Sequence, residues 1–138
     1  MDFVLDASIS AVWALADEAD PLADQILSNW AGSAAQRDTA WVPSLWWFEI
    51  RNILVMSERR KRLSADGSDA FLKLVVSFPI MTDAAPDEAA ILRYARRHQL
   101  TFYDASYPDV AVRRGLILAT LDKALVQAAL AEGVTLYL

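Results

Sequence analysis

Short apolar runs alternate along the chain with longer segments in which apolar residues recur every three or four positions. The short runs do not alternate with polar residues, which is typical of strands buried on both faces of a parallel sheet. The recurring pattern predicts helices with one apolar face. Strands are expected at residues 3–5, 40–42, 79–81, 116–119 and 134–137. Helices are expected at about residues 8–16, 21–30, 44–62, 64–76, 86–98, 104–114 and 122–132.

Residues that start or end helices agree with these limits. Pro21 and Pro86 suit a first helical turn, and Ser44 suits the N-cap of the longest helix. Gly32 suits a helix end. Strands separated by helices predict the α/β class, with three α/β/α layers and a mostly parallel sheet of about five strands. In such sheets, sites form beyond the carboxyl ends of the strands.

The composition limits the class of protein. With 138 residues, of which 55% are hydrophobic and 22% charged, we expect one globular domain over residues 1–138. The net charge of −5 excludes an overall basic field that would attract nucleic acid or membranes. The lack of cysteine excludes disulfides and thiolate zinc sites and suits the reducing cytoplasm, and a single histidine cannot build a multi-histidine metal site.

Since no export signal and no apolar run near the ~20 residues of a membrane span are found, we expect a soluble cytoplasmic protein without membrane contact.

Three aspartates stand at the ends of predicted strands or the starts of predicted helices. Asp6 closes the first strand, and Asp122 comes three residues after the end of the fourth. Asp104 stands at a helix start, just after residues 100–102. Each of the three can be an N-cap, because aspartate accepts hydrogen bonds from the free amides of a first turn. Asp6 and Asp122 are also expected at the carboxyl edge of the sheet, where a site would form.

Glu49 is harder to explain as a surface residue. Its neighbours at helical spacing include Leu45, Trp46 and Ile53, so it is expected on the apolar stripe of the long helix. Burying an unpaired carboxylate costs several kcal/mol, and no Lys or Arg stands at positions 45, 46, 52 or 53. The alternatives are a shifted helix phase, an arginine arriving from elsewhere in the fold, or a carboxylate kept for a cation.

The order of these residues carries a resemblance to a known family. The segments that carry it are Val4-Leu5-Asp6-Ala7-Ser8, Pro43-Ser44-Leu45 with Glu49 and Asn52, Leu100-Thr101-Phe102-Tyr103-Asp104-Ala105 with Tyr107, and Leu118-Ala119-Thr120-Leu121-Asp122. In order, spacing and chain length the sequence resembles the PIN-domain ribonucleases, and most closely the VapC toxins of bacterial toxin–antitoxin pairs. The resemblance covers essentially the whole chain and implies a PIN-like fold.

The resemblance also implies an acidic site that binds Mg²⁺ or Mn²⁺ and hydrolyses RNA phosphodiester bonds. Its four acids would be Asp6, Glu49, Asp104 and Asp122. Carboxylates without histidine or cysteine suit a hard cation such as Mg²⁺. We assign Asp6 and Asp104 as the central ligands. Glu49 would be a ligand or a base that positions water, and Asp122 would bind a second ion or act through water.

Two polar residues match the positions beside the family's acids. Thr120 and Asn52 would orient carboxylates or a water molecule, as outer partners of metal sites do. Thr120 can equally be a cap of the last helix.

The resemblance further implies a homodimer, an RNA substrate and a cognate VapB-type antitoxin whose tail blocks the acidic crevice. Five tryptophans, among them the adjacent Trp46 and Trp47, fit either the core or a surface for these partners. The alternatives are a catalytically inactive PIN-like module that acts by protein or RNA binding, and a metal-dependent nuclease acting on structured DNA.

Two features depart from this simple picture. Pro108 lies four residues after Asp104, so that helix is expected to begin later, with Pro108 at its first position, and Asp109 becomes a substitute or accessory carboxylate. Because an acidic crevice repels RNA, flanking cations are needed. The candidates for phosphate contact are Arg59, Arg60, Lys61 and Arg62, although cations at a helix end can simply complement the helix dipole.

Overall fold

The computed structural model describes residues 1–15, 17–32 and 38–138, and a parallel sheet lies at its centre. The strands are β1 (Phe3–Leu5), β2 (Ala40–Pro43), β3 (Ile80–Asp83) and β4 (Ile117–Ala119). They are hydrogen-bonded in the order β3-β2-β1-β4, and every pair is parallel. The expected α/β class and parallel sheet are confirmed.

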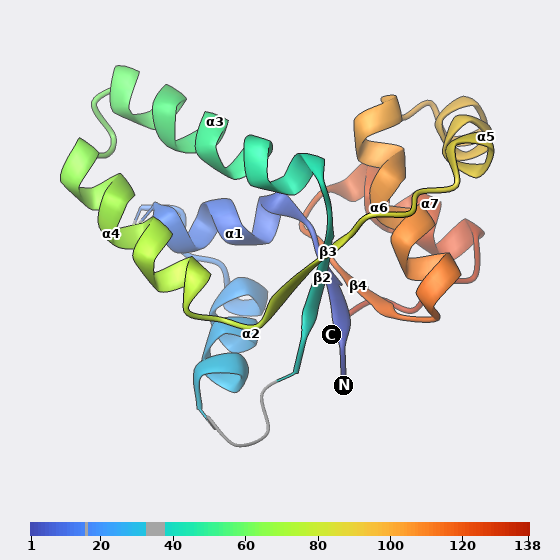
Figure 1. Cartoon of the computed structure of the whole chain (residues 1–138), viewed down its shortest axis with the longest axis horizontal. Coiled ribbons are helices and arrows are strands. Elements are labelled where there is room, and N and C mark those ends of the chain that lie inside the picture. Colours follow the sequence, from blue (N-terminus) through green and yellow to red (C-terminus); the bar gives the residue numbers. More distant parts are fainter. Residues whose placement is uncertain (16, 33–37) are drawn as a thin grey trace.

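Helices cover both faces of this sheet. They are α1 (Ala7–Ala14), α2 (Pro21–Ala31), α3 (Leu45–Arg59), α4 (Ala65–Val76), α5 (Glu88–His98), α6 (Phe102–Arg114) and α7 (Lys123–Ala131). Figure 1 shows α1 to α4 on one side of the sheet and α5 to α7 on the other, which is the three-layer arrangement. Within the described ranges, none of these helices has the length and apolarity needed to cross a bilayer.

The first strand occupies the middle of the sheet. Phe3 pairs with Ala40 of β2 on one side and with Ile117 of β4 on the other. All three β1 residues are buried, because helices cover both faces of the strand. The chain leaves this central strand at Asp6, whose amide donates to the carbonyl of Ala119 at 3.0 Å. Asp6 therefore lies at the carboxyl edge of the sheet, where β4 also ends.

The strand expected at residues 134–137 is reduced to a single bridge. Leu118 of β4 accepts a hydrogen bond from the amide of Tyr137 and donates to the carbonyl of Thr135, each at 2.9 Å. The amide of Val134 instead donates to the carbonyl of Ala129 at 2.8 Å, which closes the end of α7. Pairing with β4 starts only after this helix end, so the segment is shorter than predicted.

The long helix ends earlier than its predicted limit at residue 62. Helix α3 stops at Arg59, and Lys61 adopts a left-handed conformation with φ 58°. The amide of Arg62 then donates to the carbonyl of Ser57 at 2.9 Å, a hydrogen-bond pattern that ends many helices. The apolar pattern gives no indication of this left-handed residue.

Two other helix limits differ from the prediction. The helix expected from Pro86 begins at Glu88, because Asp87 is the N-cap and its carboxylate accepts from the amide of Ala90 at 3.1 Å. The helix expected at 8–16 is α1, and residue 16 lies outside the described residues.

The prediction that Pro108 begins its helix is wrong. Helix α6 begins at Phe102, with the Thr101 hydroxyl accepting from the amide of Asp104 at 3.0 Å as N-cap. Pro108 lies inside the helix, where it cannot donate to the carbonyl of Asp104. Residues 105–111 are all buried, so packing against the sheet and α5 outweighs the loss of one hydrogen bond.

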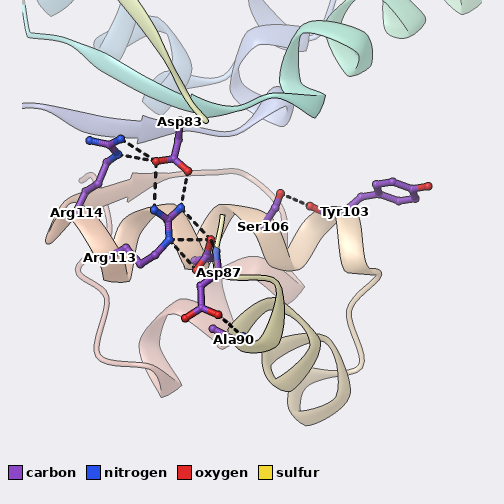
Figure 2. Close-up of polar contacts among 8 residues, drawn as sticks. Asp83, Asp87, Ala90, Tyr103, Ser106, Arg113 and Arg114 are labelled. Atoms are coloured by element: carbon purple, nitrogen blue, oxygen red, sulfur yellow. Dashed lines mark hydrogen bonds and ion pairs between the residues drawn. The ribbon is translucent and has the colours of Figure 1, made fainter. Parts of the chain in front are cut away.

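A cluster of two acids and two arginines ties the end of α6 to the end of β3 (Figure 2). Asp83, the last residue of β3, forms ion pairs with Arg113 and Arg114. Arg113 also donates to both carboxylate oxygens of Asp109 at 3.0 Å. The Arg114 guanidinium lies 3.6 Å from the centre of the Trp41 ring. Burial alone would raise the pKa of Asp83, but the hydrogen bonds and charges of Arg113 and Arg114 hold it below its ordinary value.

We expect this cluster to contribute strongly to stability. Asp83→Asn should lower the free energy of unfolding at pH 7 by about 2 kcal/mol, because it removes a buried negative charge that accepts hydrogen bonds from Arg113 and Arg114, although both arginines stay in contact with water. Since the folded-state pKa is lowered, the charge of Asp83 stabilises the fold above the ordinary value of 3.8 and this contribution is lost as pH falls through the folded-state pKa. The difference between wild type and variant should therefore shrink below about pH 4, measured by urea unfolding across pH.

The matched control is Arg62→Met, which breaks an exposed pair with Asp17 and Glu18. This control should change stability little, because exposed pairs are screened by water. Equal effects of the two variants would contradict the importance of the cluster.

Candidate functional site

The four acids predicted to form a site come from four places around the carboxyl edge of the sheet. Asp6 follows β1, and Asp122 is the N-cap of α7, shortly after β4. Glu49 lies in the second turn of α3, and Asp104 lies in the first turn of α6. The structure thus brings together residues that are far apart in the sequence.

Asp6 is the most buried of them, with only 5% of its surface exposed. Its Oδ2 atom accepts hydrogen bonds from the Ser8 hydroxyl at 2.6 Å and from the Thr120 hydroxyl at 2.7 Å. Thr120 in turn accepts from the amide of Asp122 at 3.0 Å, and Ser8 accepts from the amide of Leu121 at 2.9 Å. Two neutral hydroxyl groups therefore fix this carboxylate and join the loops after β1 and β4.

The other acids lie close enough to Asp6 to change its acidity. Burial raises the pKa of Asp6, and the hydrogen bonds from the two hydroxyls only partly oppose this effect. The negative charges of Asp122 and Asp104 raise this pKa further. Burial and the charge of Asp122 likewise raise the pKa of Asp104. The negative charges of the cluster thus repel one another.

Glu49 finds its partner on α6. The Tyr107 hydroxyl, which is fully buried, donates to Glu49 Oε1 at 2.8 Å. Burial raises the pKa of Glu49, and the charges of Asp6 and Asp104 add to this effect against the Tyr107 hydrogen bond. Burial and the same negative surroundings raise the pKa of Tyr107, so it stays protonated and remains a donor.

The predicted position of Glu49 within the apolar stripe needs correction. The buried stripe of α3 runs through Trp46, Ile50 and Leu54, so Glu49 lies at its border and is half-buried. The helix phase is shifted from the predicted one, because Trp46 and not Leu45 is the fully buried residue of the first turn. The partner from elsewhere in the fold is a tyrosine and not the arginine considered from the sequence.

Capping explains only one of the three aspartates. Asp122 Oδ1 accepts from the amides of Ala124 at 2.8 Å and Leu125 at 3.3 Å, as an N-cap does. Asp6 precedes α1 but makes no capping hydrogen bond with its side chain there. In α6 the cap is Thr101, so Asp104 does not serve as the cap. Thr120 contacts Asp6 directly and does not cap α7.

A cleft of about 460 Å³ opens beside the acids, between one face of α3 and the first turn of α6. It is lined by Leu45, Phe48, Glu49, Asn52, Thr101, Tyr103 and Asp104. Asn52 is exposed and shares this cleft with Glu49 and Asp104. Asn52 therefore lies on the side of α3 that faces the cleft beside the acids, as the sequence predicted.

The four acids lie near one another, but their side chains are not already arranged around one common metal position. In the part of the chain that the structure describes, no three His, Cys, Asp or Glu side chains are arranged to hold a metal ion together. The effects of these acids on one another's pKa place them within electrostatic reach.

Other predicted residues lie away from the cluster. Asp109 is bound by Arg113 in the cluster at the end of β3, so it does not join the four acids as an accessory carboxylate. Arg59 ends α3, about 15 Å along the helix from Glu49 at 1.5 Å per residue, and Arg60 to Arg62 follow it. Arg62 pairs with Asp17 and Glu18 of its own chain.

Two residues of the site received no role in the sequence analysis. Ser8 stands two residues after Asp6, and Tyr107 stands three residues after Asp104 on the same helix. The spacing of Tyr107 puts it on the same side of α6 as Asp104. That spacing is a local signal, whereas the contact with Glu49 depends on the fold.

Comparisons with known proteins agree with this arrangement. The PIN domain family model matches residues 3–131. The exonuclease VapC9 of Pyrobaculum aerophilum is 34% identical over 126 residues, which cover 91% of this chain and 84% of that protein.

Two solved structures have a similar fold. The crystal structure of PAE2754 from Pyrobaculum aerophilum has a TM-score of 0.67 and 28% identity, covering 93% of this chain and 87% of that one. A toxin–antitoxin complex from Klebsiella pneumoniae has a TM-score of 0.57 at 14% identity, covering 87% and 86%, which supports the fold alone. The family match over nearly the whole chain and the VapC9 relative show that this chain belongs to the PIN domain family.

Proposed function

We propose that this chain is a VapC-type toxin, a metal-dependent endoribonuclease that is neutralised by a cognate VapB-type antitoxin. The observation that carries the proposal is the buried carboxylate of Asp6, which has two hydroxyl partners and lies within electrostatic reach of Asp122, Asp104 and Glu49. A buried anion without a cation is costly, so a cluster of this kind is expected where function requires it.

The donor set of the cluster fits Mg²⁺ or Mn²⁺. Hard cations prefer oxygen ligands, and Mg²⁺ keeps several waters while binding one or two carboxylates directly. It therefore does not need three protein ligands arranged in advance. We propose Asp6, Glu49, Asp104 and Asp122 as the residues that hold the ion. When bound, a divalent ion supplies charge neutralisation for the phosphodiester and activation of the attacking water.

The chain's own residues position these acids. Ser8 and Thr120 hold one oxygen of Asp6, and this fixes the plane of its carboxylate. Tyr107 does the same for Glu49 by donating to Oε1. Restricting both carboxylates lowers the entropy that would be lost when a ligand binds.

The relatives bear on two parts of the proposal, the nuclease activity and the antitoxin partner. VapC9 is named an exonuclease, and the Klebsiella pneumoniae structure is a toxin–antitoxin complex. From these names we extend nuclease activity and an antitoxin partner to this chain. The RNA substrate and the homodimer are proposed from the resemblance of the sequence to the VapC toxins. The cysteine-free sequence suits action in the reducing cytoplasm.

The second candidate is a PIN-like module without catalysis that acts by protein or RNA binding. It is favoured by the lack of any ready-made group of three ligands in the described ranges. Cleavage assays separate the two candidates.

The proposal predicts that the purified protein cuts RNA when Mg²⁺ or Mn²⁺ is present. Because an endonuclease needs no chain end, it should also cut a circular RNA, which an exonuclease leaves intact. EDTA and Asp6→Asn should each abolish cleavage, since both remove the proposed ion site. The measurement is gel electrophoresis of a linear and a circular RNA of the same sequence.

If only the linear RNA is cut, the activity is that of an exonuclease and not of the proposed endonuclease. Cleavage that persists both in EDTA and in Asp6→Asn would refute the proposed chemistry.

A second prediction uses stability and not activity. Asp6→Asn should raise the thermal midpoint in EDTA, because it removes a buried negative charge from a repelling cluster. Mn²⁺ at about 100-fold its dissociation constant should raise the wild-type midpoint by about 5–10 °C and the variant much less. An equal response of the two proteins to Mn²⁺ would place the ion elsewhere.

Tyr107→Phe tests the positioning of Glu49. Loss of the hydroxyl should lower cleavage or metal affinity by about 10- to 100-fold, as removal of such outer partners does. The control is Tyr94→Phe, which changes another buried tyrosine on a neighbouring helix. A higher Mn²⁺ concentration for half-maximal activity in Tyr107→Phe alone is expected. The same loss in both variants would indicate a general packing effect.

A further inference from the structure

We propose that Phe48 and Tyr103 form a stacking site for the bases of single-stranded RNA at the mouth of the acidic cleft. The inference rests on the proposed nuclease function and specifies the strandedness of its substrate. Each of these two aromatic residues directly precedes an acid of the cluster, Glu49 or Asp104, and both line the same cleft.

The backbone places the two rings on different walls of the cleft. Phe48 lies on the α3 face that also carries Leu45, Glu49 and Asn52, at helical spacings of three and four. Tyr103 comes from the first turn of α6, and Figure 2 shows its side chain pointing away from the Asp83 cluster. A chain passing over the acids would therefore meet an aromatic ring from each helix.

Packing does not account for these side chains. Phe48 is 77% exposed and Tyr103 is 66% exposed, whereas the neighbouring Trp46 is fully buried. Single exposed apolar residues are common on protein surfaces. Two large aromatic rings that line one cleft together with two carboxylates are a more specific arrangement.

The lining of the cleft offers no cation to an RNA phosphate. None of the described residues that line it is a Lys or Arg. Arg113 and Arg114 are bound to Asp83, and Arg62 is bound to Asp17 and Glu18. Aromatic rings can hold bases at such a place and tolerate any base sequence, while the phosphates are left to cations outside the cleft.

Stacking also selects the strandedness of the substrate. A base can lie flat on a ring only when its face is free, and in a duplex the neighbouring base pairs cover these faces. The antitoxin proposed above is expected to reach the same crevice and would cover the two rings with its own side chains. A protein partner at this surface is therefore the competing outcome of the test.

The experiment measures binding of fluorescein-labelled RNA by anisotropy, with the full-length Asp6→Asn protein so that the probe stays intact. The probes are an eight-residue oligoadenylate, an abasic strand with the same phosphates, and a duplex hairpin. Phe48→Ala and Tyr103→Ala should each weaken oligoadenylate binding by about 5-fold or more. Phe48→Trp and Tyr103→Phe should retain it, and the abasic strand and the duplex should bind all variants alike.

The control is Leu130→Ala, which shortens an exposed apolar side chain on α7, outside this cleft. It should bind oligoadenylate like the parent protein. In Phe48→Ala, the slope of the logarithm of RNA affinity against the logarithm of salt concentration should equal that of the parent protein, because no phosphate contact is lost. Unchanged oligoadenylate binding, or an equal loss with the abasic strand, would overturn the stacking site. So would a change from dimer to monomer in Phe48→Ala with RNA affinity unaltered, which would assign the surface to a protein partner.

The outcomes separate this inference from the proposed function. If the wild-type protein cleaves RNA but the aromatic variants bind normally, only the stacking site fails. If the wild-type protein leaves RNA intact while the variants lose single-strand binding, the nuclease proposal fails and the stacking site remains.

Discussion

The site depends on the burial of one carboxylate that has no cation beside it in the described structure. Asp6 and Asp83 are both buried acids, and each stands at the carboxyl end of a strand or just after it. Asp83 is compensated by Arg113 and Arg114, which lower its pKa. Asp6 has only hydroxyl partners and negative neighbours, and its pKa is raised. The same sheet edge therefore carries one acid that is paired with arginines and one whose charge no cation of the described chain balances.

The sequence was sufficient for the parts of the site that depend on strand ends. Parallel strands end at one edge, so recognising the strands before Asp6 and Asp122 was enough to expect these two acids there. The destination of Asp109 was missed, although Arg113 stands four residues later and such a pair is a local signal. The contact of Tyr107 with Glu49 could not be predicted, because it joins α6 to α3 across 58 residues of sequence. The placement of Pro108 inside α6 reflects tertiary burial, which a local rule for proline does not include.

The acids fall into two pairs that are positioned in different ways. Asp6 and Asp122 are linked by Thr120, which donates to the first carboxylate and accepts from the amide of the second residue. This pair therefore follows the alignment of β1 with β4. Glu49 and Asp104 come from helices on opposite sides of the sheet, α3 and α6, as Figure 1 shows. Their separation depends on how two layers pack, which is less strictly set than hydrogen-bonded strand register.

The hydrogen bond from Tyr107 to Glu49 is the element that reduces this freedom. It starts on α6, three residues after Asp104, and ends on α3, so it connects the two layers at the cluster itself. The hydroxyl stays protonated because burial and the surrounding negative charge raise the pKa of Tyr107. Repulsion among the acids would push α3 and α6 apart at the cleft, and this hydrogen bond opposes that movement. This hydrogen bond therefore ties together the two helices that form the walls of the cleft, with Phe48 on one and Tyr103 on the other.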